Sequence, residues 1–267
     1  MPIENLPLLV TKLHIPPARA AWLPRQRLFE RLDHASTGKL TILSAPAGYG
    51  KTTLLAHWVS LRQQQVPSPF TYAWLTLDDA DNDPVRFWSY LAAALQTCSP
   101  ERGMGQDFFD LLRSPGSPAL QTILILLINE IARIPLEMVL VMDDLQELVS
   151  SEAIAQLIFF IDHLPQNLHL VLCGRSEPLF PLARYRAHGQ LIQLQAADLR
   201  FTQAETAAFF AQSSSLNLSQ NEVNTLDRQA EGWQPASTWH PFHWKAGRIR
   251  KVFFSPSPAA TAICWIT

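Results

Sequence analysis

The chain has 267 residues, of which 48% are hydrophobic and 16% charged, and its net charge is −2. That length accommodates one large α/β domain plus part of a second, and the composition excludes a disordered chain. A pI of about 6.4 gives no global electrostatic case for nucleic acid binding. The three cysteines are widely spaced, which argues against a disulfide scaffold or a cysteine metal site. With no signal-peptide pattern and no apolar run long enough to cross a bilayer, we expect a soluble cytoplasmic protein without membrane contacts.

Strand and helix patterns alternate along the chain. Helical spacing of apolar residues first appears at 25–32, and the short β-branched run at 39–44 predicts a buried strand. In chain order there follow a helix at 52–62, a strand at 70–77, a helix from 84, a helix at 120–133, a strand at 138–142, a helix at 152–163 and a strand at 168–173. Thr202 and Glu205 then form a capping-box pattern at the start of another helix, and one more helix is expected over 221–230. Such alternation predicts an α/β fold with a parallel sheet flanked by helices.

The loop after the first expected strand carries the strongest chemical signal. The run Ala45-Pro-Ala-Gly-Tyr-Gly-Lys-Thr52 lies between a strand and a helix, as a phosphate-binding P-loop requires. Its glycines allow backbone N–H groups to surround phosphates, and the helix N-terminus adds a favourable dipole. We expect Lys51 to reach the β- and γ-phosphates and the Thr52 hydroxyl to ligate Mg²⁺. The full predicted nucleotide-binding set in this loop is Ala47, Gly48, Tyr49, Gly50, Lys51, Thr52 and Thr53.

The strict P-loop pattern has glycine where this chain has Ala45. Alanine is small enough for a close approach of the backbone, so we expect the substitution to be tolerated. The alternative is a Gly-rich turn that matches the pattern by chance.

Two acidic residues, Asp143 and Asp144, end the apolar strand V-L-V-M-D-D. In P-loop NTPases a carboxylate at this place holds Mg²⁺, and a second one polarises the attacking water. We therefore assign Asp143 to the metal and Asp144 to water activation. The alternative is a strand-end turn in which an aspartate caps the next helix.

Arg175 follows the last expected strand in the run L-V-L-C-G-R-S. An arginine at that strand end lies beside the nucleotide site of a parallel sheet and could contact the γ-phosphate as a catalytic sensor. The alternative is a solvated loop arginine, and the sequence favours neither interpretation over the other.

These residues together resemble the N-terminal ATPase module of large MalT-like, LuxR-type bacterial transcriptional activators, which belong to the STAND class of signalling P-loop NTPases. The resemblance rests on L-L-V-T-K-L-H-I-P-P, L-P-R-Q-R-L, A-P-A-G-Y-G-K-T-T-L, A-W-L-T-L-D-D-A-D-N-D-P-V-R-F-W, V-L-V-M-D-D, G-R-S-E-P and A-D-L-R-F-T. It runs from about residue 8 to Trp233. It implies a regulatory switch in which ADP holds a closed form, while ATP with an inducer permits self-association. It also implies that Arg25, in the basic segment before the P-loop, lies near the nucleotide.

The chain departs from that family after Trp233. The family continues with an amphipathic helix, a winged-helix region, a helical sensor and a DNA-binding helix-turn-helix, whereas residues 234–267 show no apolar periodicity. A different reading frame can encode an amphipathic continuation, so we expect an aberrant tail produced by a frameshift. The expected organisation is an N-terminal segment at 1–36, a P-loop NTPase domain at 37–195, the start of a helical subdomain at 196–233 and the tail at 234–267.

The functional expectation is thus a slowly hydrolysing ATP/ADP and Mg²⁺ switch module, without specific DNA binding of its own. Two alternatives remain at this point. One is a stand-alone P-loop ATPase or kinase, for which no acceptor-substrate motif is present. The other is a truncated fragment without function.

Overall fold

The computed structural model describes residues 8–19, 22–35, 38–68, 70–99, 105–113 and 119–213. The helix expected over 221–230 and the aberrant tail expected over 234–267 lie outside these residues. Within the described part of the chain, no helix is both long and apolar enough to cross a membrane.

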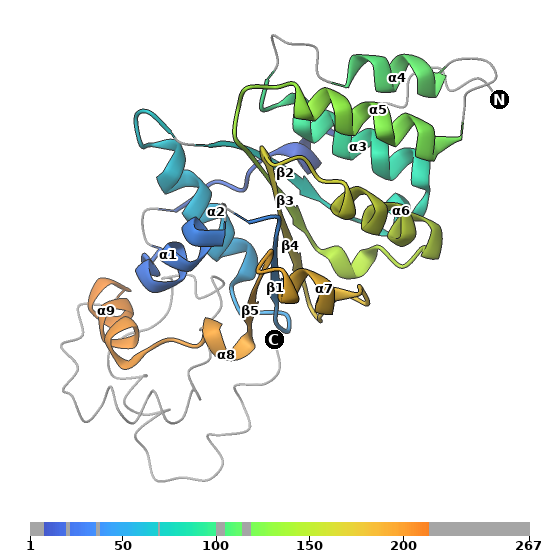
Figure 1. Cartoon of the computed structure of the whole chain (residues 1–267). Helices are drawn as coiled ribbons and strands as arrows, with labels where there is room; N and C mark the ends of the chain where they lie inside the picture. The colour runs from blue at the N-terminus through green and yellow to red at the C-terminus, as the bar shows by residue number, and fades with distance from the viewer. Residues whose placement is uncertain are drawn as a thin grey trace.

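Five parallel strands form one sheet in the order β2-β3-β4-β1-β5 (Figure 1). Their bounds are β1 Leu40–Ser44, β2 Thr71–Thr76, β3 Met138–Asp143, β4 Leu168–Gly174 and β5 Leu191–Gln195. The first four match the expected strands, and the α/β fold with a parallel sheet is confirmed. The fifth was not predicted, because this edge strand is only partly buried and alternates apolar with polar residues.

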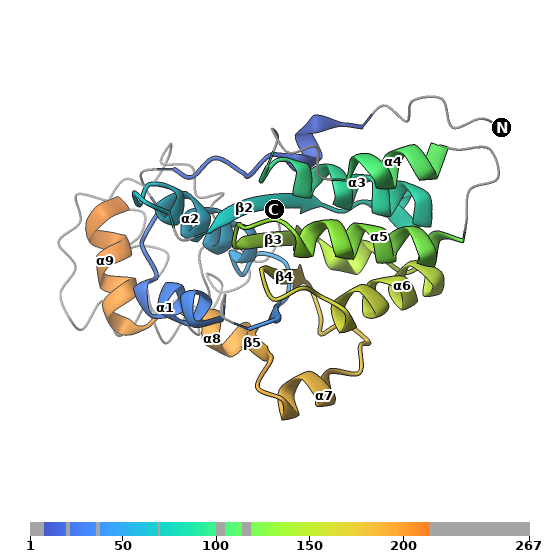
Figure 2. The same cartoon turned by 45° about the horizontal axis from the view of Figure 1, so that its top comes forward.

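Helices cover both faces of the sheet (Figures 1 and 2). Their bounds are α1 Gln26–Ala35, α2 Lys51–Gln63, α3 Pro84–Gln96, α4 Gln106–Arg113, α5 Leu120–Ala132, α6 Ser151–Asp162, α7 Leu182–Ala187, α8 Ala196–Leu199 and α9 Gln203–Ser213. Short 3-10 turns lie at η1 Val10–Leu13, η2 Asp79–Asn82 and η4 Leu145–Glu147. The helices predicted within the described residues are present, whereas α4, α7 and α8 were not predicted. The capping box at α9 is confirmed, since the Glu205 N–H donates to Thr202 Oγ1 and the Thr202 N–H donates to the Glu205 carboxylate.

The strands β1 to β4 are largely buried on both faces, because their side chains alternate between two hydrophobic clusters. In β3, Met138, Leu140 and Met142 pack against α3, α5 and α6, while Val139 and Val141 pack with residues of α1 and α2. All five side chains are at most 1% exposed. Near-continuous apolar runs of this kind are what a parallel sheet covered on both faces requires. The sheet is therefore packed on both faces, and the loops extend from its carboxyl-terminal edge.

The side chain of Asn82 fixes the loop that follows β3. Its Nδ2 donates to the backbone carbonyls of Asp79 and Glu147, both at 2.8 Å. Its Oδ1 accepts the N–H groups of Val149 and Ser150, both at 2.7 Å. One amide thus satisfies four backbone groups and ties the turn after β2 to the turn after β3.

A buried ion pair fastens the N-terminal segment to the same region. Lys12, 8% exposed, pairs with the fully buried Asp81 and also with Asp78 at 3.0 Å, and its ammonium lies 4.3 Å from the centre of the Tyr90 ring. The turn η1 thereby lies along the edge strand β2, as Figure 2 shows. Buried charges persist only when they are paired, so this contact holds the loop after β2 in one position.

His169 lies inside the sheet, on β4, and is 2% exposed. Its Nδ1–H donates to the Gly38 carbonyl at 2.9 Å, so its Nε2 accepts from the Thr41 hydroxyl, also at 2.9 Å. Burial lowers the pKa of His169 to about 4. The ring is therefore neutral in the folded protein at neutral pH.

We predict that replacing Asn82 with alanine lowers the free energy of unfolding by about 2 kcal/mol, because four backbone groups lose their partner. Urea denaturation measures the change. Asn129→Ala removes the same side chain from an exposed position of α5 and should change the free energy of unfolding little. A loss for Asn82→Ala no larger than that of Asn129→Ala would contradict the role of Asn82 in holding the two turns together.

His169 should make the fold sensitive to mild acid. Its pKa is about 4 in the folded state and roughly 6.5 when unfolded, so the unfolded chain binds more protons between these values. The contribution of neutral His169 to the stability of the folded state is complete above the pKa of the unfolded chain. It is lost as the pH falls toward the pKa of the folded state. We predict that His169 contributes a loss of about 2 kcal/mol in the free energy of unfolding between pH 7 and pH 5. His169→Gln should show a smaller loss over the same range in urea titrations; an equal loss would refute the assignment.

Candidate functional site

The P-loop connects the carboxyl end of β1 to the N-terminus of α2. Gly48 and Gly50 adopt left-handed backbone angles, with φ of 82° and 72°. A residue with a side chain is strained there, so the two glycines allow the tight turn. The helix begins at Lys51, and the first internal bond runs from the Leu54 N–H to the Gly50 carbonyl. Its first N–H groups are left without intrahelical partners and form an anion site at the helix N-terminus.

Ala45, which takes the place of the usual first glycine, points away from the pocket into the core. It is 2% exposed and belongs to the hydrophobic cluster under α1 and α2. Its N–H donates to the Gly174 carbonyl at 3.2 Å. Because its methyl group is buried in the core, it takes no space from the pocket.

A hydrogen bond connects the P-loop helix to the central strand β3. The Thr52 hydroxyl donates to Asp143 Oδ2 at 2.6 Å, and Asp143 is 2% exposed. Asp143 Oδ1 accepts the backbone N–H of Asp144 at 3.0 Å. Asp143 is therefore no cap for the following helix; Ser150 caps α6 instead. Beside this pair, burial and the Asp143 charge raise the pKa of the Cys173 thiol well above its usual value, so the thiol is uncharged.

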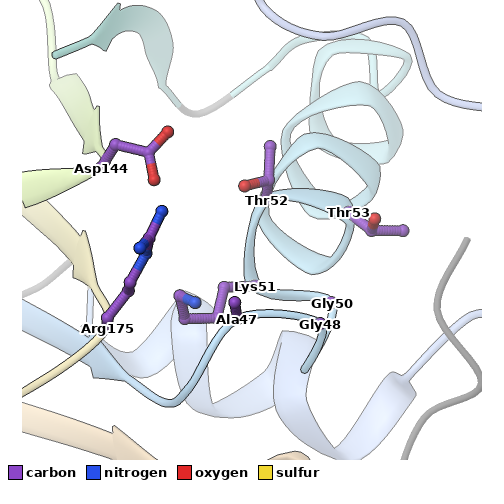
Figure 3. Close-up of a pocket in the computed structure, with 8 residues that line it drawn as sticks. All are labelled: Ala47, Gly48, Gly50, Lys51, Thr52, Thr53, Asp144 and Arg175. Carbon is purple, nitrogen blue, oxygen red and sulfur yellow. The ribbon is translucent and has the colours of Figure 1, made fainter. Parts of the chain in front are cut away.

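Asp144 and Arg175 face the P-loop across an open pocket (Figure 3). In that view the Arg175 side chain extends toward the Asp144 carboxylate, and Thr52 faces the same space from α2. Asp144 has φ 57° and ψ 42°, a left-handed conformation that non-glycine residues seldom adopt. The Lys51 ammonium donates to the Pro46 carbonyl at 3.2 Å, next to the pocket.

The residues that line this pocket are Ala47, Gly48, Gly50, Lys51, Thr52, Thr53, Asp144 and Arg175. The structure thus brings together eight of the residues selected from the sequence. The pocket has a volume of about 240 Å³, which is below the roughly 300–1,000 Å³ of pockets that enclose whole small-molecule ligands. The pocket suits a chain of phosphates, with the rest of a larger ligand lying outside it.

Three residues of the predicted set do not line the pocket: Asp143, which contacts the pocket residue Thr52, and Tyr49 and Arg25. Tyr49 is half-buried and packs against the hydrophobic cluster under α1 and α2. Arg25 is 2% exposed, and its guanidinium contacts the Leu199 and Arg200 carbonyls and the Glu205 carboxylate at 2.9–3.0 Å. Burial lowers the pKa of Arg25, while the ion pair with Glu205 opposes that shift. In the described structure Arg25 therefore connects α1 to the segment leading into α9, and its donors point there.

Gln146 belongs to the site and was not predicted. Its side chain contacts both the Asp144 carboxylate and the Arg175 backbone. Asn82, which fixes the same turn, was likewise not selected. Asn82 lies in the run D-D-A-D-N-D-P, where a turn-rich polar cluster was the available signal. A lone glutamine after two aspartates carries no such signal, because its partners are brought to it only by the fold.

The oxygen atoms at the site fit a magnesium ion. Thr52 and Asp143 offer a hydroxyl and a carboxylate already in contact, and Mg²⁺ is usually held by one or two protein groups together with phosphate oxygens and water. Across the described ranges no cluster of three or more His, Cys, Asp or Glu side chains could hold a metal. A cation at this place would therefore depend on the phosphates of a ligand.

Comparison with known proteins agrees with this geometry. Residues 33–180 match the AAA domain family. The chain is 32% identical over 235 residues to the HTH-type transcriptional regulator MalT of Yersinia enterocolitica and 31% identical over 229 residues to MalT of Cronobacter sakazakii. Each alignment covers 86% of this chain and 24% of the relative. The chain thus spans about a quarter of the length of the curated relatives it matches.

Among solved structures, the fold is similar to a signal transduction ATPase with numerous domains (STAND) and a tetratricopeptide repeat sensor from Pyrococcus horikoshii. The TM-score is 0.55 at 13% identity, over 81% of this chain and 29% of that chain. At that identity the likeness concerns the fold. The matched family model, the parallel sheet and the P-loop agree: the chain belongs to the AAA domain family of P-loop NTPases and is similar over most of its length to MalT-type transcriptional regulators.

Proposed function

We propose that this domain binds ATP or ADP with Mg²⁺ and acts as a slowly hydrolysing switch module of a MalT-like transcriptional regulator. The observation that carries the proposal is the convergence of a helix N-terminus, Lys51, Thr52 and Asp144 on one phosphate-sized pocket, with Asp143 hydrogen-bonded to Thr52 behind it. Backbone N–H groups and a lysine cation stabilise phosphate oxygens, and the Asp144 carboxylate lies across the pocket from them.

Each residue then has a separate task. Lys51 binds the β- and γ-phosphates, while Thr52 and Asp143 would hold Mg²⁺. Bound there, the ion would neutralise phosphate charge. Asp144 accepts a hydrogen bond from the attacking water, and Arg175 contacts the γ-phosphate from the end of the neighbouring strand β4. A site of this kind works by positioning and electrostatic stabilisation.

We assign Tyr49 and Arg25 tasks outside the phosphate pocket. Tyr49 contributes its backbone to the loop while its ring packs below it. Arg25 connects α1, which precedes the P-loop, to α9 through Glu205. A change in the nucleotide would reach α9 through this ion pair.

Regulation by the whole protein extends beyond the described domain. In a MalT-like parent, the ADP-bound form would be the resting one, and the ATP-bound form would self-associate. We assign no sequence-specific DNA binding to the domain itself, whose chain has a net charge of −2. The relatives carry HTH in their names, and we assign promoter binding in the parent to that kind of module.

We predict that Lys51→Ala weakens ATP binding at least tenfold, because the phosphates lose a charge-assisted hydrogen bond of about 1.5–3 kcal/mol. Equilibrium titration with a fluorescent ATP analogue measures the affinity. Lys39→Ala is the matched control, since Lys39 precedes the amino end of the same strand β1 and donates to the Asp162 carbonyl instead. Wild-type affinity in Lys51→Ala would refute the site.

We further predict that Asp143→Asn removes most of the increase in ATP affinity that Mg²⁺ produces. A neutral amide is a poorer ligand for a hard cation than a carboxylate. Titrations with and without Mg²⁺ test this, and Asp144→Asn, the neighbouring carboxylate, should keep the increase. The same Mg²⁺ effect in Asp143→Asn and in the wild type would exclude Asp143 as the ligand.

A further inference from the structure

One side chain connects the two loops that oppose the P-loop. Gln146 lies in the turn η4 between the end of β3 and the start of α6. Its Nε2 donates to Asp144 Oδ1 at 2.8 Å, and its Oε1 accepts the backbone N–H of Arg175 at 3.1 Å. The amide thus uses its shorter donor contact on the acid at the end of β3 and its acceptor on the residue after β4; Nε2 also donates to Glu147 Oε1 at 3.3 Å.

The acid that Gln146 contacts has a strained backbone. Asp144 is the only non-glycine residue of the described chain with a positive φ. Such a conformation costs on the order of 1–3 kcal/mol and persists only where the surroundings enforce it. Here the Asp144 N–H is bound to Asp143, and its carboxylate is bound to Gln146. Both bonds constrain the direction in which the carboxylate points.

The turn that carries Gln146 is itself held from two sides. Asn82 binds the Glu147 carbonyl and the N–H groups of Val149 and Ser150, immediately after the turn. On the other side the end of β4 packs against it: a Cβ added to Gly174 would lie 3.7 Å from Gln146 Oε1. Gln146 therefore extends from a fixed backbone into a defined space between two strand ends.

We infer that Gln146 is a positioning residue that holds the Asp144 carboxylate and the Arg175 loop where they face the phosphate pocket. Gln146 does not line the pocket, so it acts through these two residues. This role rests on the proposed function, because it presumes that Asp144 and Arg175 act on a bound triphosphate. Loss of the amide should disturb the hydrolytic step more than nucleotide binding, which depends on the P-loop and Lys51.

The test compares Gln146→Ala with the wild-type full chain in two measurements, the ATP affinity and the rate of a single turnover of bound ATP with Mg²⁺. We expect an affinity within about threefold of wild type and a rate about 10- to 100-fold lower, the range typical of groups that orient a reacting residue. Gln121→Ala, an exposed glutamine on α5, is the matched control and should change neither quantity. A residue needed only for folding would lower both together.

Gln146→Glu separates the two hydrogen bonds. The new carboxylate can still accept from the Arg175 N–H, but it repels the Asp144 carboxylate instead of donating to it. We expect this variant to turn over ATP at least as slowly as Gln146→Ala. A wild-type rate in Gln146→Glu would overturn the assigned contact with Asp144.

The remaining outcomes also decide the matter. A wild-type rate in Gln146→Ala, or a rate and an affinity lowered by the same factor, would overturn the positioning role. Neither outcome would contradict nucleotide binding by the wild-type domain. Binding without hydrolysis in the wild type would also overturn the positioning role. Absence of nucleotide binding by the wild type would instead refute the proposed function itself, and this inference with it.

Discussion

Three parallel strands, β1, β3 and β4, end at the same edge of the sheet, and every contact at the site depends on that arrangement. β1 delivers the P-loop, β3 delivers the two aspartates and β4 delivers Arg175. In open α/β sheets a crevice forms outside the carboxyl ends of the strands. The hydrogen bond from Thr52 to Asp143 completes this arrangement, because it joins the helix after β1 to the end of β3.

Polar side chains position the loops around that edge, while the hydrophobic core positions the strands. The core clusters hold the strands from both faces, and Leu77, Leu145 and Leu148 also anchor the turns after β2 and β3 in the core. The polar groups of these turns need partners of their own. Asn82, Gln146 and the Lys12–Asp81 pair supply those partners, because they satisfy backbone groups and charges of neighbouring turns. Side-chain amides suit this task because each offers donors and acceptors in one plane. The three contacts run from the N-terminal segment to the pocket.

A second set of charges connects the domain to the helical segment that follows it. Arg25 and Arg27 on the α1 side both pair with Glu205 of α9, and Arg31 pairs with Asp198 of α8. Arg25 also stacks over the Phe201 ring at 4.4 Å. Removing one partner of a buried ion pair leaves an uncompensated charge, which is strongly destabilising. This contact therefore opposes separation of α9 from α1, and α1 directly precedes the strand that leads into the P-loop.

Local patterns in the sequence were sufficient to predict most of the strands and helices and most residues of the site. Apolar runs and helical spacing predicted four strands and the main helices, and the P-loop, Asp143-Asp144 and Arg175 were selected because each belongs to one short motif. The sequence by itself thus determined the chemistry at each strand end. Only the tertiary structure decided which groups meet. It added the edge strand β5, directed Arg25 to Glu205 instead of the pocket, and brought Gln146 between Asp144 and Arg175. The physical reason is that the Arg25 and Arg175 contacts join residues far apart in the chain, and no local periodicity or motif encodes such a pairing.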